Sequence, residues 1–206
     1  PQKETLSTGM RREVDRCRAA VEAARTGKDV AVVCSGDSGV YGMAGLIYEV
    51  AQEYDPIEIE VVPGITAACG GAAVLGAPLT HDFAVVSLSD LLTPWEKITA
   101  RLTAAAQADF VLCLYNPASH SRPDYLQRAD YLKRACEIFL RYKSSNTVCG
   151  IVKNIGRDGE TKKVMTLAEL KDYEADMFTT VFVGNSQTKV IGGKMVTPRG
   201  YLQRGE

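Results

Sequence analysis

Four short segments of this chain are rich in small or hydroxyl residues, and each follows an apolar run. They span residues 35–42, 63–67, 115–120 and 184–188. Glycine lets the backbone come close to a ligand, and backbone N–H groups at the start of a following helix meet polar or negative groups. In open α/β sheets, ligands bind beyond the carboxyl ends of the strands, and each of the four segments is expected at such an end. Each alone is also compatible with an ordinary turn, and the prediction of a binding site rests on the four together.

The first segment differs from the two commonest nucleotide-binding loops. It reads GDSGVYG over residues 36–42. This matches neither the GxGxxG pattern of dinucleotide sites nor the GxxxxGK[ST] pattern of phosphate-binding loops, and no lysine follows that could meet a phosphate. The segment therefore indicates a different kind of ligand.

Helical and strand patterns alternate through almost the whole chain, which predicts an α/β fold. The first helix is expected to begin at Ser7 or Thr8 and to end before Gly27. Short apolar runs at 30–34 and 57–62 predict buried strands. The pattern breaks at 76–79, which predicts a first domain at 1–79 and a second at 80–206.

The second domain begins like the first but ends in antiparallel strands, which predicts a mixed sheet. Residues 93–96 (TPWE) and 166–169 (TLAE) are typical of helix starts, and a Gly-Gly pair at 192–193 suits a two-residue hairpin turn. The expected strands are 83–88, 110–114, 147–153, 162–165, 180–183, 189–191 and 194–196, and the expected helices are 93–106, 124–141 and one starting at Thr166.

Composition narrows the class of protein. The 206 residues are 46% hydrophobic and 24% charged with a formal net charge of −1, which is typical of a soluble α/β protein. The basic excess that accompanies non-specific nucleic-acid binding is missing, and no apolar run is long enough to span a membrane. The six cysteines show no CxxC spacing, which favours reduced thiols in a cytoplasmic protein, and with two histidines they predict no metal site.

Two of the segments resemble motifs of a known family, the tetrapyrrole (corrin/porphyrin) methylases. The GDSGVYG segment is similar to their GDPxxYG motif, with Ser38 in place of the usual proline, and residues 62–67 (VPGITA) are similar to their VPGIT motif. Three later segments resemble the branch that methylates C17 of precorrin-3B, or of cobalt-factor III in anaerobic pathways. They are residues 87–95, 114–119 and 197–201. The resemblance spans essentially the whole chain.

The resemblance implies a homodimer in which two α/β domains of tetrapyrrole methylase type bind S-adenosyl-L-methionine in the cleft between them. It also implies a tetrapyrrole substrate in cobalamin biosynthesis. By motif match, the first domain meets the methionine side of the cofactor, the second meets the adenosine, and the C-terminal motif closes the pocket. The implied cofactor contacts are Gly36, Asp37, Ser38, Val40, Tyr41, Thr66, Ala67, Leu114, Tyr115, Asn116, Gly184, Asn185, Thr197 and Pro198.

Methyl transfer from a sulfonium is an in-line displacement in which the cofactor carries the reactivity, so no catalytic triad is expected. This branch also contracts the macrocycle, which needs proton transfers. The candidate acids and bases are Asp37, His81, Asp90 and His120. Each is also compatible with a structural role, and Asp37 could cap a helix. We expect cations for the substrate's carboxylates from Arg122 and Lys153, although such side chains usually lie on a solvated surface.

One part of the family pattern is not matched. The family begins with a strand and a GxGPG loop on the floor of the cleft, and nothing before Leu6 resembles them. We therefore expect the first domain to lack that strand. Two alternatives stay open: an enzyme of the same family with another ring carbon or another substrate, and a non-catalytic cofactor-binding module.

Overall fold

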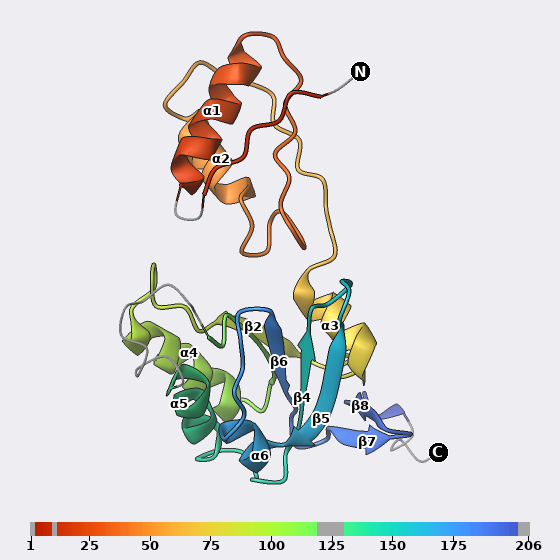
Figure 1. Ribbon diagram of the computed structural model, residues 1–206. Helices are drawn as coiled ribbons and strands as arrows, with labels where there is room; N and C mark the ends of the chain where they lie inside the picture. The colour runs from red at the N-terminus through yellow and green to blue at the C-terminus, as the bar shows by residue number, and fades with distance from the viewer. Residues whose placement is uncertain (1–2, 10–11, 119–129, 202–206) are drawn as a thin grey trace. The chain divides into compact units, whose positions relative to one another are not determined.

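The structure, a computed structural model, describes residues 3–9, 12–118 and 130–201 (Figure 1). Its contacts divide the chain into two compact units, Pro1–Thr66 and Ala67–Glu206. The expected boundary after Leu79 differs from this division, because the helix α3 (Ala67–Leu75) and the strand β1 (Gly76–Ala77) pack within the second unit. The position of the domain boundary stays a prediction.

Two helices form the first unit, α1 (Glu13–Arg25) and α2 (Ala44–Ala51). Their buried core consists of Cys17, Val21 and Val50. The expected start of α1 at Ser7 or Thr8 is wrong. The hydroxyl of Thr8 accepts a hydrogen bond from the guanidinium of Arg16 at 2.8 Å, and its carbonyl oxygen accepts a second at 3.2 Å. Thr8 thus pairs with a side chain instead of capping the first helical turn.

The two strands expected in the first unit, 30–34 and 57–62, are also wrong. Within the described residues neither segment pairs in a strand ladder. A strand needs a neighbour about 4.8 Å away to satisfy its backbone groups. Here both segments instead line a groove of about 600 Å³ together with residues of α1 and α2. Val33 is 87% exposed, which a strand buried on both faces would not allow.

The second unit is built on a five-stranded sheet of order β2-β3-β6-β4-β5, in which β2 and β3 are the only neighbouring strands that pair in parallel. A three-stranded sheet has the order β1-β8-β7 and is also mixed. The α/β class, the mixed sheet and both expected hairpins, β4–β5 and β7–β8, are confirmed. The elements are β2 (Phe83–Ser87), α4 (Trp95–Gln107), β3 (Val111–Tyr115), α5 (Asp130–Phe139), β4 (Val148–Lys153), β5 (Thr161–Thr166), α6 (Leu167–Lys171), β6 (Thr179–Val183), β7 (Lys189–Ile191) and β8 (Lys194–Val196).

Helices cover both faces of the five-stranded sheet (Figure 1). Side chains of α4, α5 and α6 form one core with the strands, and α3 forms the other. Along β3, Leu112 and Leu114 belong to the first core and Cys113 to the second, and all three are fully buried. Burial on both faces explains the continuous apolar run from which this strand was predicted. In the part of the chain that the structure describes, no helix is both long and apolar enough to cross a membrane.

The two helix starts expected in the second unit have different outcomes. At α6 the capping box is confirmed: the Thr166 hydroxyl accepts from the Glu169 N–H at 3.3 Å, and the Glu169 carboxylate accepts from the Thr166 N–H at 2.7 Å. At α4 the expected cap, Thr93, is wrong. The helix begins at Trp95, and extended Pro94 is its N-cap, with no side-chain hydrogen bond.

Replacing Gly150 by alanine is expected to destabilise the second unit. A Cβ at Gly150 would lie 2.7 Å from Cδ1 of Leu75, where β4 contacts α3. Overpacking of this kind costs about 1–3 kcal/mol, measurable as the free energy of unfolding in urea. Gly45→Ala is the control, because no atom lies within 4 Å of the place its Cβ would take. Unchanged stability of Gly150→Ala would contradict this packing, and adding Leu75→Val should restore part of the loss.

Candidate functional site

The carboxylate of Asp37 ties two of the expected loops together in the first unit. Its Oδ1 accepts hydrogen bonds from the N–H groups of Gly39 at 2.8 Å and Val40 at 3.0 Å, and its Oδ2 accepts one from Gly64 at 2.9 Å. The bonds from Gly64 and Gly39 lower the pKa of Asp37 below its usual range. The segments 36–42 and 63–66 therefore form one structure, which we call the Asp37 cradle.

Glycine is required at two positions of the Asp37 cradle because backbone meets backbone there. A Cβ on Gly64 would lie 2.1 Å from the carbonyl oxygen of Gly36, and a Cβ on Gly42 would lie 2.4 Å from that of Ser38. The Ser38 hydroxyl adds a further tie by donating to the carbonyl oxygen of Val62 at 3.0 Å.

The Asp37 cradle has free space beside Gly36, where a side chain would otherwise stand. This residue has a left-handed φ of 78°, and a Cβ there would meet nothing closer than 3.8 Å, with the Cα of Thr66 at 3.9 Å. Tyr41 also has a left-handed φ, of 53°, and its side chain is exposed. The structure thus brings together the expected cofactor residues of the first unit, which are Gly36, Asp37, Ser38, Val40, Tyr41 and Thr66.

Several expected residues of the second unit lie at one end of its five-stranded sheet, which we call the Tyr115 end. Tyr115, the last residue of β3, pairs in register with Ser87 of β2. Lys153, the last residue of β4, pairs with Thr179 at the start of β6, and β6 also pairs with β3. The segments that follow β2, β3 and β4 therefore all leave the sheet at this end.

Hydrogen bonds fix the backbone at the Tyr115 end. The phenol oxygen of Tyr115 accepts from the N–H of Ala68 at 2.6 Å, which places the first turn of α3, and with it Ala67, beside Tyr115. Asn116 has a left-handed φ of 53°, and its side-chain amide donates to Oγ of Ser87 at 2.9 Å. The side chain of Leu114 is fully buried in the core, so a ligand at this end would meet its backbone.

Two expected polar side chains at the Tyr115 end are paired. The Oδ2 of Asp90 accepts a hydrogen bond from the hydroxyl of Tyr131 at 2.5 Å. The ammonium of Lys153 lies 2.6 Å from Oδ2 of Asp176, and this hydrogen bond raises the pKa of Lys153. Asp90 and Lys153 are thus held in place by partners that the sequence did not indicate.

The remaining expected residues of the second unit lie at the opposite end of the sheet, which we call the Gly184 end. β6 runs antiparallel to β3, so Val183, its last residue, pairs with Leu112 near the start of β3. The two ends are separated by the length of β3, roughly 15 Å. His81 also lies at this end, because it precedes β2. The structure therefore does not bring Gly184 and Asn185 beside Tyr115, with which the resemblance had grouped them, because the strand before Gly184 is antiparallel to β3.

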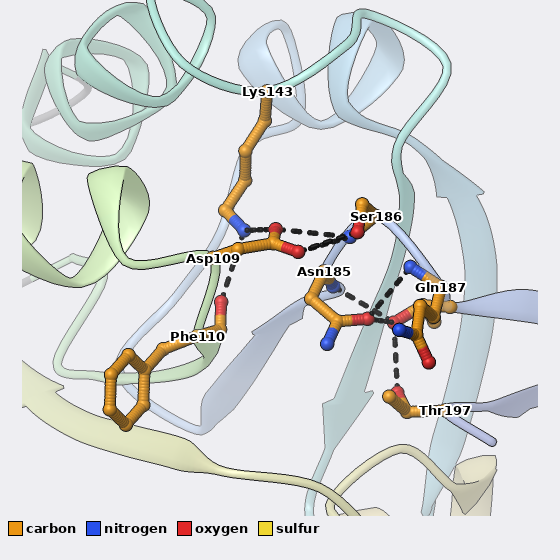
Figure 2. A network of polar contacts seen from close by, with 8 residues as sticks. Asp109, Phe110, Lys143, Asn185, Ser186, Gln187 and Thr197 are labelled. Carbon is orange, nitrogen blue, oxygen red and sulfur yellow. Dashed lines mark hydrogen bonds and ion pairs between the residues drawn. The ribbon is translucent and has the colours of Figure 1, made fainter. Parts of the chain in front are cut away.

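Hydroxyl and amide groups bond to one another at the Gly184 end (Figure 2). The Oδ1 of Asn185 accepts from the Gln187 N–H at 3.0 Å and from the Thr188 hydroxyl at 3.1 Å. The Thr188 hydroxyl also lies 2.8 Å from that of Thr197, the residue before Pro198. A Cβ on Gly184 would stand 2.6 Å from Oγ1 of Thr188, so packing within the chain explains this glycine. These contacts join the 184–188 segment to the residues that follow β8.

Sequence reasoning missed the ion pair that supports the 184–188 segment. The carboxylate of Asp109 lies 3.2 Å from the ammonium of Lys143, whose side chain is only 2% exposed, and accepts hydrogen bonds from the N–H and hydroxyl of Ser186 (Figure 2). Burial favours a higher pKa for Asp109, but the bonds from Ser186 and the charge of Lys143 outweigh it and lower the pKa. The left-handed φ of 56° at Asp109 is visible only in the structure, and no motif marks the pair.

The other expected residues add little to the site. The Nδ1 of His81 accepts a hydrogen bond from the Asp82 N–H at 2.8 Å. His120 and Arg122 lie outside the described residues. Across residues 3–9, 12–118 and 130–201, no group of three or more His, Cys, Asp and Glu side chains could hold a metal ion.

The chain belongs to the family described as Tetrapyrrole (Corrin/Porphyrin) Methylases, whose family model matches residues 1–171. Members of this family use S-adenosylmethionine as methyl donor. The family assignment made from the GDSGVYG and VPGITA segments is therefore confirmed.

The relatives also confirm the assignment to a branch. A probable cobalt-factor III C(17)-methyltransferase of Salmonella typhimurium is 48% identical, over 97% of this chain and 80% of that protein. A cobalt-factor III methyltransferase of Priestia megaterium is 47% identical over 98% of this chain, which spans only 37% of that longer protein. The crystal structure of the methyltransferase CobJ superimposes with a TM-score of 0.84 at 36% identity, covering 96% of this chain and 83% of that one.

The hydrogen bonds of Asp37 predict an acid-sensitive cradle. Because the pKa of folded Asp37 is lowered, its bonds add stability above the pKa of an unfolded aspartate, about 4, and this stability is lost as the pH falls through the lowered value. In Asp37→Asn an amide N–H₂ can face the Gly64 N–H, so the tie to Gly64 breaks at every pH. We expect the hydrogen-exchange protection of the Gly64 amide to be high at pH 7 in the wild type, to fall below about pH 4, and to be low throughout in the variant.

Asp55→Asn provides the control for this experiment, because Asp55 is an exposed aspartate of the same unit. It should leave Gly64 protected. Equal protection of Gly64 in the wild type and Asp37→Asn at pH 7 would show that the carboxylate does not hold the two segments together.

Proposed function

We propose that this chain is an S-adenosylmethionine-dependent C-methyltransferase that acts on C17 of precorrin-3B or cobalt-factor III, with ring contraction, in cobalamin biosynthesis. The observation that carries the proposal is the Asp37 cradle, in which one carboxylate joins the two motifs that mark the family. The branch rests on the relatives, which are cobalt-factor III methyltransferases at 47–48% identity.

The residues of the Asp37 cradle fit the methyl donor. The free space beside Gly36 leaves room for a ligand where a side chain would otherwise stand, and the exposed backbone at Gly39 and Val40 is held rigid by Asp37. When bound, S-adenosylmethionine supplies a methyl group on a positively charged sulfur, which a carbon nucleophile displaces in line. We assign its binding to Gly36, Asp37, Ser38, Val40, Tyr41 and Thr66 of the first unit, with Ala67, Leu114, Tyr115 and Asn116 of the second.

The Tyr115 end suits a large, partly apolar and anionic substrate. Leu92 is 99% exposed after β2, and Phe178 is 48% exposed just before β6 at the same end. The ammonium of Lys153 lies at this end too, so the end offers apolar contacts to the faces of a tetrapyrrole and a cation for one of its carboxylates.

We do not assign the Gly184 end to the donor site, because this end of the sheet lies opposite the Tyr115 end. The residues concerned are Gly184, Asn185, Thr197 and Pro198. We propose that their contacts instead fix the C-terminal part of the fold. The expected homodimer and the expected cytoplasmic location stay predictions.

Product analysis with a labelled methyl donor tests the function. The chain is incubated with methyl-labelled S-adenosylmethionine and either cobalt-factor III or precorrin-3B. We expect one labelled methyl group, bound to C17. A label on another ring carbon would favour the alternative of another enzyme of the same family.

Calorimetry with S-adenosylmethionine and S-adenosylhomocysteine distinguishes the methyltransferase from the alternative of a non-catalytic cofactor-binding module. Binding without methyl transfer would favour a cofactor-binding module. The measurement is repeated on a version carrying the N-terminal strand and GxGPG loop of the family. Failure of both versions to bind either compound would refute the proposal.

Lys153 is expected to contribute to substrate affinity. Lys153→Met should raise the KM for the tetrapyrrole roughly tenfold, the effect of losing one charge-assisted contact, and leave the KM for S-adenosylmethionine unchanged. Asp176→Asn should lower the KM for the tetrapyrrole, because it frees the ammonium that Asp176 now holds. Lys163→Met is the control, since Lys163 is an exposed lysine of the same hairpin. An unchanged substrate KM in Lys153→Met would exclude the contact.

A further inference from the structure

Two residues of the motif at 87–95, one of the three that mark the branch, contact the same side chain outside it. Asp90, in the middle of the motif, accepts the hydrogen bond of the Tyr131 hydroxyl at 2.5 Å. Trp95, at its end, packs its ring against that of Tyr131, with centroids 4.7 Å apart and planes inclined by 31°. Tyr131 lies at the start of α5, so the motif is completed by a residue that sequence reasoning did not single out.

Arg134 holds the two rings in place. Its guanidinium lies 4.4 Å from the centroid of the Trp95 ring and 5.8 Å from that of Tyr131. A cation at these distances is attracted to the aromatic face, and residues three apart lie on one side of a helix. The Tyr131 hydroxyl is therefore fixed by contacts from the start of α4 and from α5, and it points at the carboxylate of Asp90.

Asp90 lies where the proposed reaction takes place. The segment that carries it leaves β2 beside β3, where the N–H of Leu88 donates to the carbonyl oxygen of Tyr115 at 2.8 Å. Of the expected acids and bases in the described part of the second unit, His81 and Asp90, only Asp90 is at the Tyr115 end. Asp37, in the first unit, uses its carboxylate to hold the cradle.

We propose that Tyr131 is a positioning residue that aims the carboxylate of Asp90 at the proton that the ring releases on methylation. The proposal rests on the proposed function. A neutral ring that gains a methyl group carries one extra positive charge. An O–H bond forms at Asp90 while an N–H or C–H bond of the ring breaks, and the electron pair left on the ring cancels that charge. A hydrogen bond from Tyr131 fixes the direction from which the carboxylate accepts the proton.

Kinetics of the full chain test the proposal with S-adenosylmethionine and the tetrapyrrole. Tyr131→Phe removes the hydroxyl and keeps the ring against Trp95. We expect kcat to fall about tenfold with both KM values unchanged, and Asp90→Asn to lower kcat about a hundredfold. The double variant should be no slower than Asp90→Asn, because Tyr131 acts through Asp90. A wild-type kcat in Tyr131→Phe, or a double loss equal to the product of the single losses, would overturn the proposal.

Two controls separate positioning from general stability. Tyr142→Phe changes an exposed tyrosine that follows α5 and should leave kcat unchanged. Fluorescence of Trp95, the only tryptophan of the chain, should stay the same in Tyr131→Phe if the ring stack survives.

The proposal and the proposed function fail in different ways. A wild-type protein that transfers no methyl group to C17 would refute the proposed function, and crystal structures of the wild type and Tyr131→Phe would then decide the positioning role. A displaced Asp90 carboxylate in the variant supports it. A carboxylate in the same place in both structures overturns it.

Discussion

The carboxylate of Asp37 is the interaction on which the first unit's part of the site depends. A carboxylate accepts several hydrogen bonds and donates none, so it can satisfy three backbone N–H groups from two segments at once. The lack of a side chain at Gly64 makes the approach sterically possible, and the carboxylate of Asp37 makes it favourable. Ser38, which departs from the family motif, also joins the two segments. Its hydroxyl donates a hydrogen bond to the carbonyl oxygen of Val62, the residue before the second segment. A serine in place of the usual proline therefore adds a hydrogen bond that helps to join the two segments.

The direction of β6 organises the second unit. In an all-parallel sheet the segments after β3 and β6 would lie at the same end, but an antiparallel β6 sends them to opposite ends. The proposed donor and substrate contacts of the second unit thus lie at the Tyr115 end, while bonds within the chain hold the Gly184 end. The ion pair of Asp109 and Lys143 adds little net stability, since the cost of taking the buried Lys143 ammonium out of water offsets its attraction to the Asp109 carboxylate, which is 44% exposed. Its evident effect is to hold Ser186, and with it the 184–188 segment, in one place.

Structural features were predictable from the sequence where interactions between neighbouring residues determine them. The capping box at Thr166 and the Gly192–Gly193 hairpin need only neighbouring residues, and both are present. The strands expected at 30–34 and 57–62 failed because a strand exists only with a partner, which an apolar run cannot supply by itself. The same limit applies to the site. Motif spacing brought 36–42 together with 63–66, but the family resemblance also grouped Gly184 with Tyr115, and the partners of Asp90 and Lys153 come from distant segments.

The two aspartates of the predicted acid–base set illustrate how surroundings assign roles to one residue type. The three backbone donors that hold Asp37 also stabilise its charge, and a carboxylate with a lowered pKa is a weak base. The carboxylate of Asp37 therefore has a structural role. This suits a reaction in which the cofactor carries the reactivity and the protein mainly positions the reactants. Asp90 instead accepts a hydrogen bond from the phenol hydroxyl of Tyr131 at 2.5 Å, and the ring that carries this hydroxyl packs against Trp95, over which Arg134 lies. A proton-transfer group needs a fixed direction, and the aromatic stack supplies that direction at the end of the sheet where the proposed substrate contacts lie.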